Sequence, residues 1–397
     1  TTAITSEMEE IVAFRLGGAE ERGLNRIFPY RFDHLAHDKC EYPKRSFYTR
    51  GERCISTNAD VLLTGDLGFE KQVIKASHDG FTIDLSDTIL HSKVYPNPQN
   101  PTPLLIKLDG HDDVVIRGGT VVRHDDLSTR WGQSYHKGMH SSGLTLDRSD
   151  GSVTIDGLRL HNTHDGIVVA GRLHHEKYVT VRHVYATHIR DDVIENDGMK
   201  DVVVEDCLFD GVFTGFSAVN SGSGKLGNID PVVTIRDTLV RMENMAGDPT
   251  PSTTDHGWGH GRLFKWWDSD APKLVLENNI FVIEESDGWS DSANKKIVHS
   301  ANNILIWMGD GEYRGTVPAG FTLIEGDDSA FREARHAWLE RHGYDPNGSL
   351  EKNLHAPVLD GAKPAPEPEP AATPSSSGGG DRIPGARPRL PPRGSTR

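Results

Sequence analysis

A short strand-like pattern recurs along the middle of this chain, and it restricts the possible folds more than any other feature. Each copy is a run of β-branched residues that ends in a polar turn. Clear copies begin at Val153, Val179, Val202, Val233 and Leu274, and fainter ones begin at Val114 and Phe81. Imperfect repetition of short strands, with no helix between them, predicts an all-β solenoid in which each coil stacks on the coil before it.

The composition agrees with this fold and excludes some classes of binding partner. Apolar residues make up 36% of the 397 residues, which suits a coil that buries only its inward-pointing side chains. The formal net charge of −15 argues against nucleic acid or an anionic membrane as a partner. No apolar run approaches the roughly 20 residues needed to cross a bilayer. We therefore expect no nucleic-acid or membrane partner, and we expect a monomer.

The cysteines indicate a compartment. Cys40 and Cys54 flank a polar, basic loop, and we interpret them as a disulfide, with two reduced thiols as the alternative. A disulfide fits an oxidising environment, so we expect a secreted or periplasmic protein. Cys207 follows a repeat strand and is expected to be a small core residue.

The pattern divides the chain into four parts. Residues 1–75 lack the repeat and are expected to cap the open end of the solenoid, because an exposed coil edge would pair with other chains. Residues 76–326 hold the parallel coils. Residues 327–361 show apolar residues at helical spacing and predict a C-terminal helix. Residues 362–397 form a Pro/Gly/Ser/Arg-rich tail with too little apolar content to order itself.

Stacking the coils brings acidic residues together. Counted from the first residue of each repeat strand, Asp165 and Asp191 occupy the same position in successive coils, with Asp192 beside the latter. Stacked strands lie about 4.8 Å apart. Carboxylates at so short a distance from each other must retain a proton, bind a cation or be neutralised by a basic residue such as Arg190. The run continues to Glu195, and we expect a functional site here, with a polar ladder of turn residues as the alternative.

A second cluster lies between His256 and Trp267, in a glycine-rich loop. Tryptophan in such a loop suggests a platform on which a sugar ring stacks, with core aromatic residues as the alternative. If Phe264 is buried, strand alternation places Lys265 on the outer face. An insertion at residues 125–142 carries Tyr135 and His136, and inserted loops commonly build the binding face of a solenoid.

Two kinds of metal site follow from these clusters. Calcium is a candidate cofactor for Asp165, Asp191 and Asp192, because it prefers oxygen ligands. Zinc at His256 and His260 is disfavoured, since the intervening glycines oppose the helix that would bring them together. The residues establish neither metal with certainty.

The order of four motifs resembles a known group of enzymes. They are Asn162-Thr163-His164-Asp165, Asp191-Asp192, Gly259-His260-Gly261 and Arg262-Leu263-Phe264-Lys265. With the coil pattern over roughly residues 80–310, they resemble the right-handed parallel β-helix carbohydrate-active enzymes, which include pectate-lyase-like, alginate-lyase-like and polygalacturonase-type proteins. His164 is inserted relative to the polygalacturonase pattern, and the last two motifs are fused. The resemblance implies a right-handed parallel β-helix that acts on a polysaccharide.

The leading hypothesis is a polysaccharide lyase acting on an acidic, uronate-containing polysaccharide or oligosaccharide. β-Elimination needs a group that neutralises the substrate carboxylate, a base, and an acid for the leaving group. The candidate catalytic residues are Lys265 as base, His188 or His260 as alternative base or acid, Arg190 as neutraliser, and Asp191 and Asp192. The candidate substrate contacts are Asp165, His164, Glu195, Arg262, Trp266, Trp258, Tyr135 and His136.

Two other functions stay open. A glycoside hydrolase would use Asp192 as the acid, with Asp165 and Asp191 as partners, and the acidic bulk charge suits a neutral substrate. A non-catalytic, carbohydrate-binding β-helix would need no acid or base.

Overall fold

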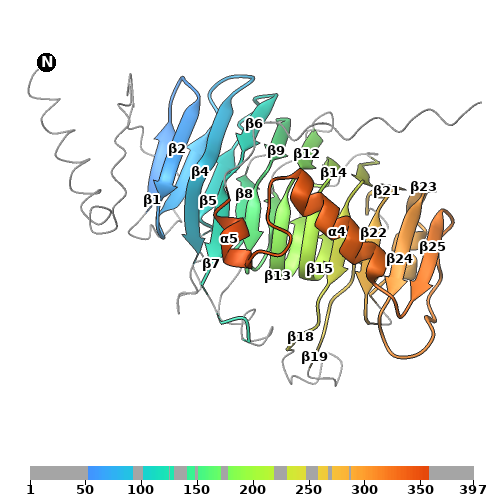
Figure 1. Cartoon of the computed structure of the whole chain (residues 1–397). Coiled ribbons are helices and arrows are strands. Elements are labelled where there is room, and N and C mark those ends of the chain that lie inside the picture. The colour runs from blue at the N-terminus through green and yellow to red at the C-terminus, as the bar shows by residue number, and fades with distance from the viewer. Residues whose placement is uncertain are drawn as a thin grey trace, which may run out of the picture. The chain divides into compact units, whose positions relative to one another are not determined.

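A computed structural model describes residues 52–92, 102–124, 126–128, 141–147, 151–170, 178–218, 230–246, 258–266, 271–285 and 288–356. The chain divides into two compact units, Thr1–Leu359 and Asp360–Arg397, and every described residue belongs to the first. Most of the expected N-terminal cap and the whole expected tail therefore lie outside the described residues. The described part is mainly strand, and its strands pair in parallel, one coil after another (Figure 1).

The strands form three stacks, and the first, face A, contains the sequence repeat. Val153 pairs with Val179, which pairs in turn with Val202, Val233 and Leu274. The stacking predicted from the repeat is therefore confirmed. Face A consists of β2 (Val61–Asp66) and β4 (Thr82–Ser92) in their first halves, β6 (Val114–Arg117), β9 (Val153–Asp156), β12 (Tyr178–Arg182), β14 (Asp201–Glu205), β16 (Val232–Arg236), β21 (Lys273–Glu277) and β23 (Ile297–Ala301).

Faces B and C complete the coils as far as β20, so the chain there passes through A, B and C in turn, as in an all-β parallel solenoid. After β20, the described strands belong to faces A and B. Face B contains the second halves of β2 and β4, β7 (Thr120–Arg123), β10 (Arg159–His161), the first halves of β13 (Tyr185–Glu195) and β15 (Leu208–Ser217), β17 (Leu239–Met242), β22 (Ile280–Ile283), β24 (Asn303–Trp307) and β25 (Phe321–Glu325). Face C contains β1 (Glu52–Ser56), β3 (Lys71–Lys75), β5 (Leu104–Lys107), β8 (Leu144–Asp147), β11 (Ile167–Val169), the second halves of β13 and β15, and β20 (Phe264–Lys265).

The coils extend further towards the N-terminus than the sequence predicts. Strands β1 and β3 pair with each other, β3 pairs with β5, and β2 pairs with β4. Coils are thus present from Glu52, within the segment assigned to the cap. The repeat signature misses them because charged and polar residues interrupt their apolar alternation, as in Lys71-Gln72.

The corner between faces A and B explains why each repeat ends in glycine or a polar residue. Gly157, His183, Asp206, Asp237 and Asn278 all adopt positive φ there. The left-handed conformation is least costly for glycine, asparagine and aspartate. Asn278 also donates its side-chain amide to Asp237 Oδ1 on the coil before, at 3.0 Å. The polar turns of the sequence pattern are therefore a backbone requirement of the corner.

Helix α4 (Ser329–Arg341) covers the outer side of face B (Figure 1). Its buried Phe331 and Trp338 pack on an outward apolar row that includes Tyr185, Leu208 and Leu239. The helix therefore crosses several coils, and it shields side chains that a bare sheet would expose. The short helix α5 (Leu350–Leu354) follows, and α3 (Asp291–Asn294) lies in the loop before β23.

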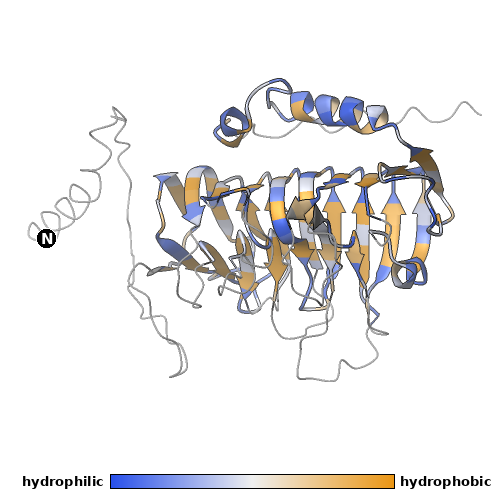
Figure 2. Cartoon of the chain, turned by 90° about the horizontal axis from the view of Figure 1, so that it is seen from below, coloured by the Kyte–Doolittle hydropathy of each residue, from blue (hydrophilic) through white to orange (hydrophobic). Residues whose placement is uncertain are grey.

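Hydrophobic residues are concentrated on the strands, whereas α4 is largely hydrophilic (Figure 2). No helix among the described residues is long and apolar enough to span a membrane. Cys207 is a buried, free thiol in the core, as predicted. Cys54 lies on β1, whereas Cys40 is outside the described residues, so the expected disulfide stays a prediction.

Candidate active site

The predicted stacking of the acidic turns is confirmed by the backbone hydrogen bonds between them. The turn between β10 and β11 begins at Asn162, whose N–H donates to the Thr187 carbonyl at 3.0 Å. Asp191 N–H donates to the His164 carbonyl at 2.7 Å, and Gly166 N–H donates to the Asp192 carbonyl at 2.8 Å. The Asp165 turn therefore lies directly against Asp191 and Asp192 of β13.

Strand β13 contains a bulge at this point. Its register against β15 shifts between Ile189 and Asp192. Against the preceding coil, His161 pairs with Thr187, but Ile167 pairs with Ile194, so β13 again carries one extra residue. Consecutive residues of a regular strand point to opposite faces, and a bulge removes that constraint. The bulge explains how the neighbouring residues Asp191 and Asp192 both contact one cation.

That cation is the ammonium group of Lys265. Lys265 lies on β20 in the row that also contains Glu195 and Ser217. Phe264 beside it is buried in the core, so Lys265 points outward, as the alternation predicts. Its Nζ lies 2.5 Å from Asp191 Oδ1 and 2.7 Å from Asp192 Oδ1, and its side chain is 19% exposed.

Burial and mutual repulsion give these carboxyl groups unequal acidity. Burial and the neighbouring Asp191 raise the pKa of Asp192 to about 7, although Lys265 opposes the shift. Burial and the charge of Asp165 raise the pKa of Glu195 to about 9. Burial alone would lower the pKa of Lys265, but Asp192 and Asp191 outweigh it and the net pKa is raised, so the amine stays protonated. Near neutral pH, Glu195 is therefore protonated and Asp192 is close to half protonated.

Arg190 ties the acidic turn to the neighbouring chain. Its guanidinium is buried and donates from Nε to Asn162 Oδ1 at 2.6 Å and from Nη2 to the Asp126 carbonyl at 2.7 Å. Asn162 in turn donates to the Arg123 carbonyl at 3.2 Å. These bonds to neutral oxygens fix the position of the turn. They leave Arg190 better suited to holding the site in place than to neutralising a substrate carboxylate.

His164 completes a group that can accept a cation. The imidazole is buried, with Nδ1 3.3 Å from Asp165 Oδ1 and 3.9 Å from Asp191 Oδ2. One ligand atom from each of His164, Asp165 and Asp191 lies within 4.8 Å of the others. Asp192, which the sequence placed in this set, instead belongs to the ion pair with Lys265. An imidazole ligand suits zinc or another transition metal better than calcium.

The two candidate catalytic histidines have different surroundings. His188 Nδ1 lies 2.9 Å from Glu243 Oε2, an acidic partner that the sequence pattern did not reveal. His260 Nδ1 lies 2.7 Å from the Gly261 carbonyl, and its Nε2 accepts the backbone N–H groups of Glu284 and Glu285 at 2.8 and 2.9 Å. Both nitrogens of His260 therefore bond to backbone, which favours one neutral tautomer and argues against proton transfer.

The expectation that Trp266 stacks on a sugar is wrong. The indole is 1% exposed, packs edge-on against Phe264, and donates Nε1–H to the Pro272 carbonyl at 2.7 Å. Alternation places Trp266 inward together with Phe264. Arg262 lies partly buried in the turn before β20, where its carbonyl accepts Gly215 N–H.

Three expected substrate contacts cannot be placed. Trp258 lies on the short strand β19 (Trp258–Gly259), which pairs with β18 (Met245–Ala246), but its side chain is outside the described part. Tyr135 and His136 lie outside the described residues altogether, so these roles stay predictions.

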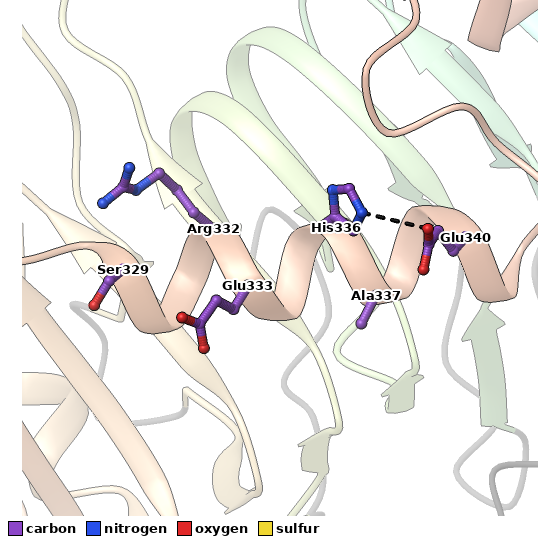
Figure 3. A pocket seen from close by; sticks show the side chains of 6 residues that line it. All are labelled: Ser329, Arg332, Glu333, His336, Ala337 and Glu340. Atoms are coloured by element: carbon purple, nitrogen blue, oxygen red, sulfur yellow. Dashed lines mark ion pairs between the residues drawn. The ribbon is translucent and has the colours of Figure 1, made fainter.

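A cavity of about 420 Å³ lies on the outer face of α4 (Figure 3). Its lining comes from that single helix and consists of Ser329, Arg332, Glu333, His336, Ala337 and Glu340. His336 and Glu340 pair at 3.3 Å and are both about half exposed or more. A depression on one helix face lacks the converging groups that a catalytic site needs, so the carboxylate cluster is the better candidate.

No family model, curated protein or solved structure matches this chain. The resemblance of its motifs to the β-helix carbohydrate-active enzymes therefore stays a prediction.

Proposed function

We propose that this protein is a right-handed parallel β-helix that hydrolyses a glycosidic bond at Asp165, Asp191 and Asp192. The observation that carries the proposal is the Lys265 ammonium group held between Asp191 and Asp192, with Asp165 on the coil below. Glycoside hydrolysis needs one protonated and one ionised carboxyl group near the same bond. Burial and Asp191 raise the pKa of Asp192 to about 7, so this carboxyl group can supply the proton, and Asp165 and Asp191 are the carboxyl groups beside it.

The roles follow from these environments. Asp192, as the acid, gives its proton to the glycosidic oxygen as the bond to the anomeric carbon breaks. Asp165 or Asp191, as the base, takes a proton from the water whose oxygen forms the new bond to that carbon. Lys265 holds the two aspartates of β13 in place. Proton and bond changes balance to one water consumed and one reducing end formed.

The right-handed winding rests on a general rule of chain geometry. Each coil returns to face A through a crossover that joins parallel strands, for example from β9 to β12. Such connections are right-handed in about 98% of cases. Secretion to an oxidising compartment stays part of the proposal, and it depends on the Cys40–Cys54 disulfide.

A lyase is the second candidate, and one observation favours it. That observation is the group formed by His164, Asp165 and Asp191, whose ligand atoms could hold a metal ion. Lys265 itself counts against a lyase, since an amine kept protonated by its two partners is a poor base for β-elimination. A cation bound by His164, Asp165 and Asp191 would draw Asp191 away from Lys265 and would also neutralise a substrate carboxylate. The lyase therefore requires a metal, whereas the hydrolase does not.

Incubation with neutral glycans and with uronate polymers separates the two functions. New reducing ends are counted in parallel with the ultraviolet absorbance of an unsaturated uronate, with and without a chelator. We expect reducing ends without that absorbance, and no effect of the chelator. A rise in absorbance that the chelator removes would establish the lyase instead.

A further inference from the structure

A second cavity, of about 330 Å³, lies between face B and the C-terminal segment. The row of outward positions that crosses it contains His161, Thr187, Asp210 and Arg241, paired in register on β10, β13, β15 and β17. The neighbouring outward row is apolar and is covered by α4. The cavity is therefore polar, because the outward row that lines it carries hydrogen-bonding side chains, whereas the neighbouring row under α4 is apolar.

Some of the lining groups already use their polar atoms in contacts that hold the C-terminal segment in place. Arg335 Nε donates to Asp210 Oδ2 at 2.5 Å, which ties α4 to β15. Asn353 uses both ends of its amide on the backbone of Asp345, at 2.9 Å each. These bonds fix the C-terminal segment over face B and leave a cavity with a defined shape.

Other lining groups retain hydrogen-bonding capacity. Within the described part of the chain, the Arg241 side chain makes no ion pair or hydrogen bond. Glu243 uses Oε2 for His188, and Glu284 uses Oε2 for the Asn244 amide at 2.8 Å. Gly211 has φ of +81°, and a Cβ there would lie 2.6 Å from Glu243 Oε2, so glycine keeps room for this carboxylate.

The charges of these groups select the ligand. Apart from the Arg335–Asp210 pair, one guanidinium, that of Arg241, stands near two carboxylates, and its charge acts on both Glu243 and Glu284. A uronate would be repelled by the two carboxylates. Neighbouring hydroxyl groups of a neutral sugar can donate to the carboxylates and accept from Arg241. A volume of about 330 Å³ lies at the small end of ligand pockets, which run from about 300 to 1,000 Å³.

The cavity adjoins the carboxylate cluster along the chain. His188 lines it, and Arg190 and Asp191 follow on the same strand. Leu127 also lines it, and the carbonyl of Asp126 beside Leu127 accepts a hydrogen bond from Arg190. A sugar in the cavity would thus lie beside the turn that carries the catalytic carboxylates.

We infer that this cavity binds a neutral sugar residue through Arg241, Glu243 and Glu284, next to the bond that is cleaved. The inference rests on the proposed function in its last clause only. It deepens that function by assigning a neutral rather than a uronate glycan as the substrate.

Binding is measured on Asp192→Asn, which is expected to lose most of the activity, so that catalysis interferes little. Glucose, galactose, mannose and galacturonate are tested by saturation-transfer NMR, and the dissociation constant of each binder is then determined. Further substitutions are Arg241→Ala and Glu243→Gln, which keeps an acceptor for His188. Arg332→Ala on the outer face of α4 is the control (Figure 3).

We expect at least one neutral sugar to bind, and each cavity substitution to weaken it about tenfold, the effect of one charge-assisted hydrogen bond. Arg332→Ala should change nothing. Binding of galacturonate alone, or neutral-sugar binding that neither cavity substitution weakens, overturns the inference. If Asp192→Asn keeps full activity while Arg241→Ala loses binding, the proposed catalysis fails and the cavity assignment stands.

Discussion

Replacing Lys265 by methionine tests the buried ion pairs at the centre of the site. The substitution keeps the length of the side chain and removes its charge. Asp191 and Asp192 are almost fully buried and would lose the ammonium group that now lies 2.5 and 2.7 Å away. Removing one partner of a buried ion pair typically costs about 3–5 kcal/mol, because it leaves an uncompensated charge. We therefore expect Lys265→Met to lower the free energy of unfolding by about that amount near neutral pH.

Lys273→Met is a matched control on β21, the next strand along the chain. Lys273 pairs with Asp230, and the two side chains are 42% and 63% exposed. Exposed pairs contribute about 0–1 kcal/mol, so the control should stay close to the parent protein. Urea unfolding followed by tryptophan fluorescence measures both variants, since the chain has seven tryptophans.

The loss of stability caused by Lys265→Met should also depend on pH in a definite direction. Without Lys265, Asp191 and Asp192 would bind protons more tightly when folded than when unfolded. A carboxyl group of that kind stabilises the fold below its unfolded pKa near 3.8, and the stabilisation is lost as the pH rises through the folded pKa. The destabilisation should therefore shrink as the pH falls towards about 4. A Lys265→Met protein as stable as the Lys273→Met control at all pH values would refute the reasoning.

Three further outcomes follow from the same structure. The pKa of Asp192 is raised to about 7, chiefly by burial, and the acid must be protonated, so the hydrolysis rate should fall as the pH rises through that value; a rate that rises there would contradict the assignment. Trp266→Ala should lower the free energy of unfolding by about 3–5 kcal/mol and leave sugar affinity unchanged, as urea unfolding and the NMR titration would show; a loss of affinity alone would restore it as a sugar platform. Dialysis against a chelator should leave hydrolysis unchanged, because Lys265 rather than a metal neutralises Asp191; a loss that zinc restores would assign the cation site.

The repeat in the sequence was sufficient to predict the stacking of the coils. The apolar first residues of the five copies pair in register, because identical coil positions must meet when parallel strands stack. The same counting placed Asp165 against Asp191, and strand alternation placed Lys265 on the outer face. These features depend on local period, which a single sequence contains.

Features that depend on distant backbone groups could not be predicted. The sequence does not reveal the bulge in β13, because counting from the strand start does not show where one extra residue is accommodated. His260 looked catalytic because its partners, the N–H groups of Glu284 and Glu285, lie more than 20 residues further along the chain. Trp266 looked exposed because it follows a glycine-rich loop, but tertiary packing buries it.

The most direct test of the account compares reducing-end release by the parent protein and by Asp192→Asn on a neutral glycan that the parent cleaves. Both are measured at a pH below the raised pKa of Asp192, where this carboxyl group is protonated in the parent protein. General-acid catalysis is worth about 10²–10⁴-fold, so the variant should lose activity by that factor while it stays folded. A folded Asp192→Asn protein that releases reducing ends at the parental rate would contradict the account.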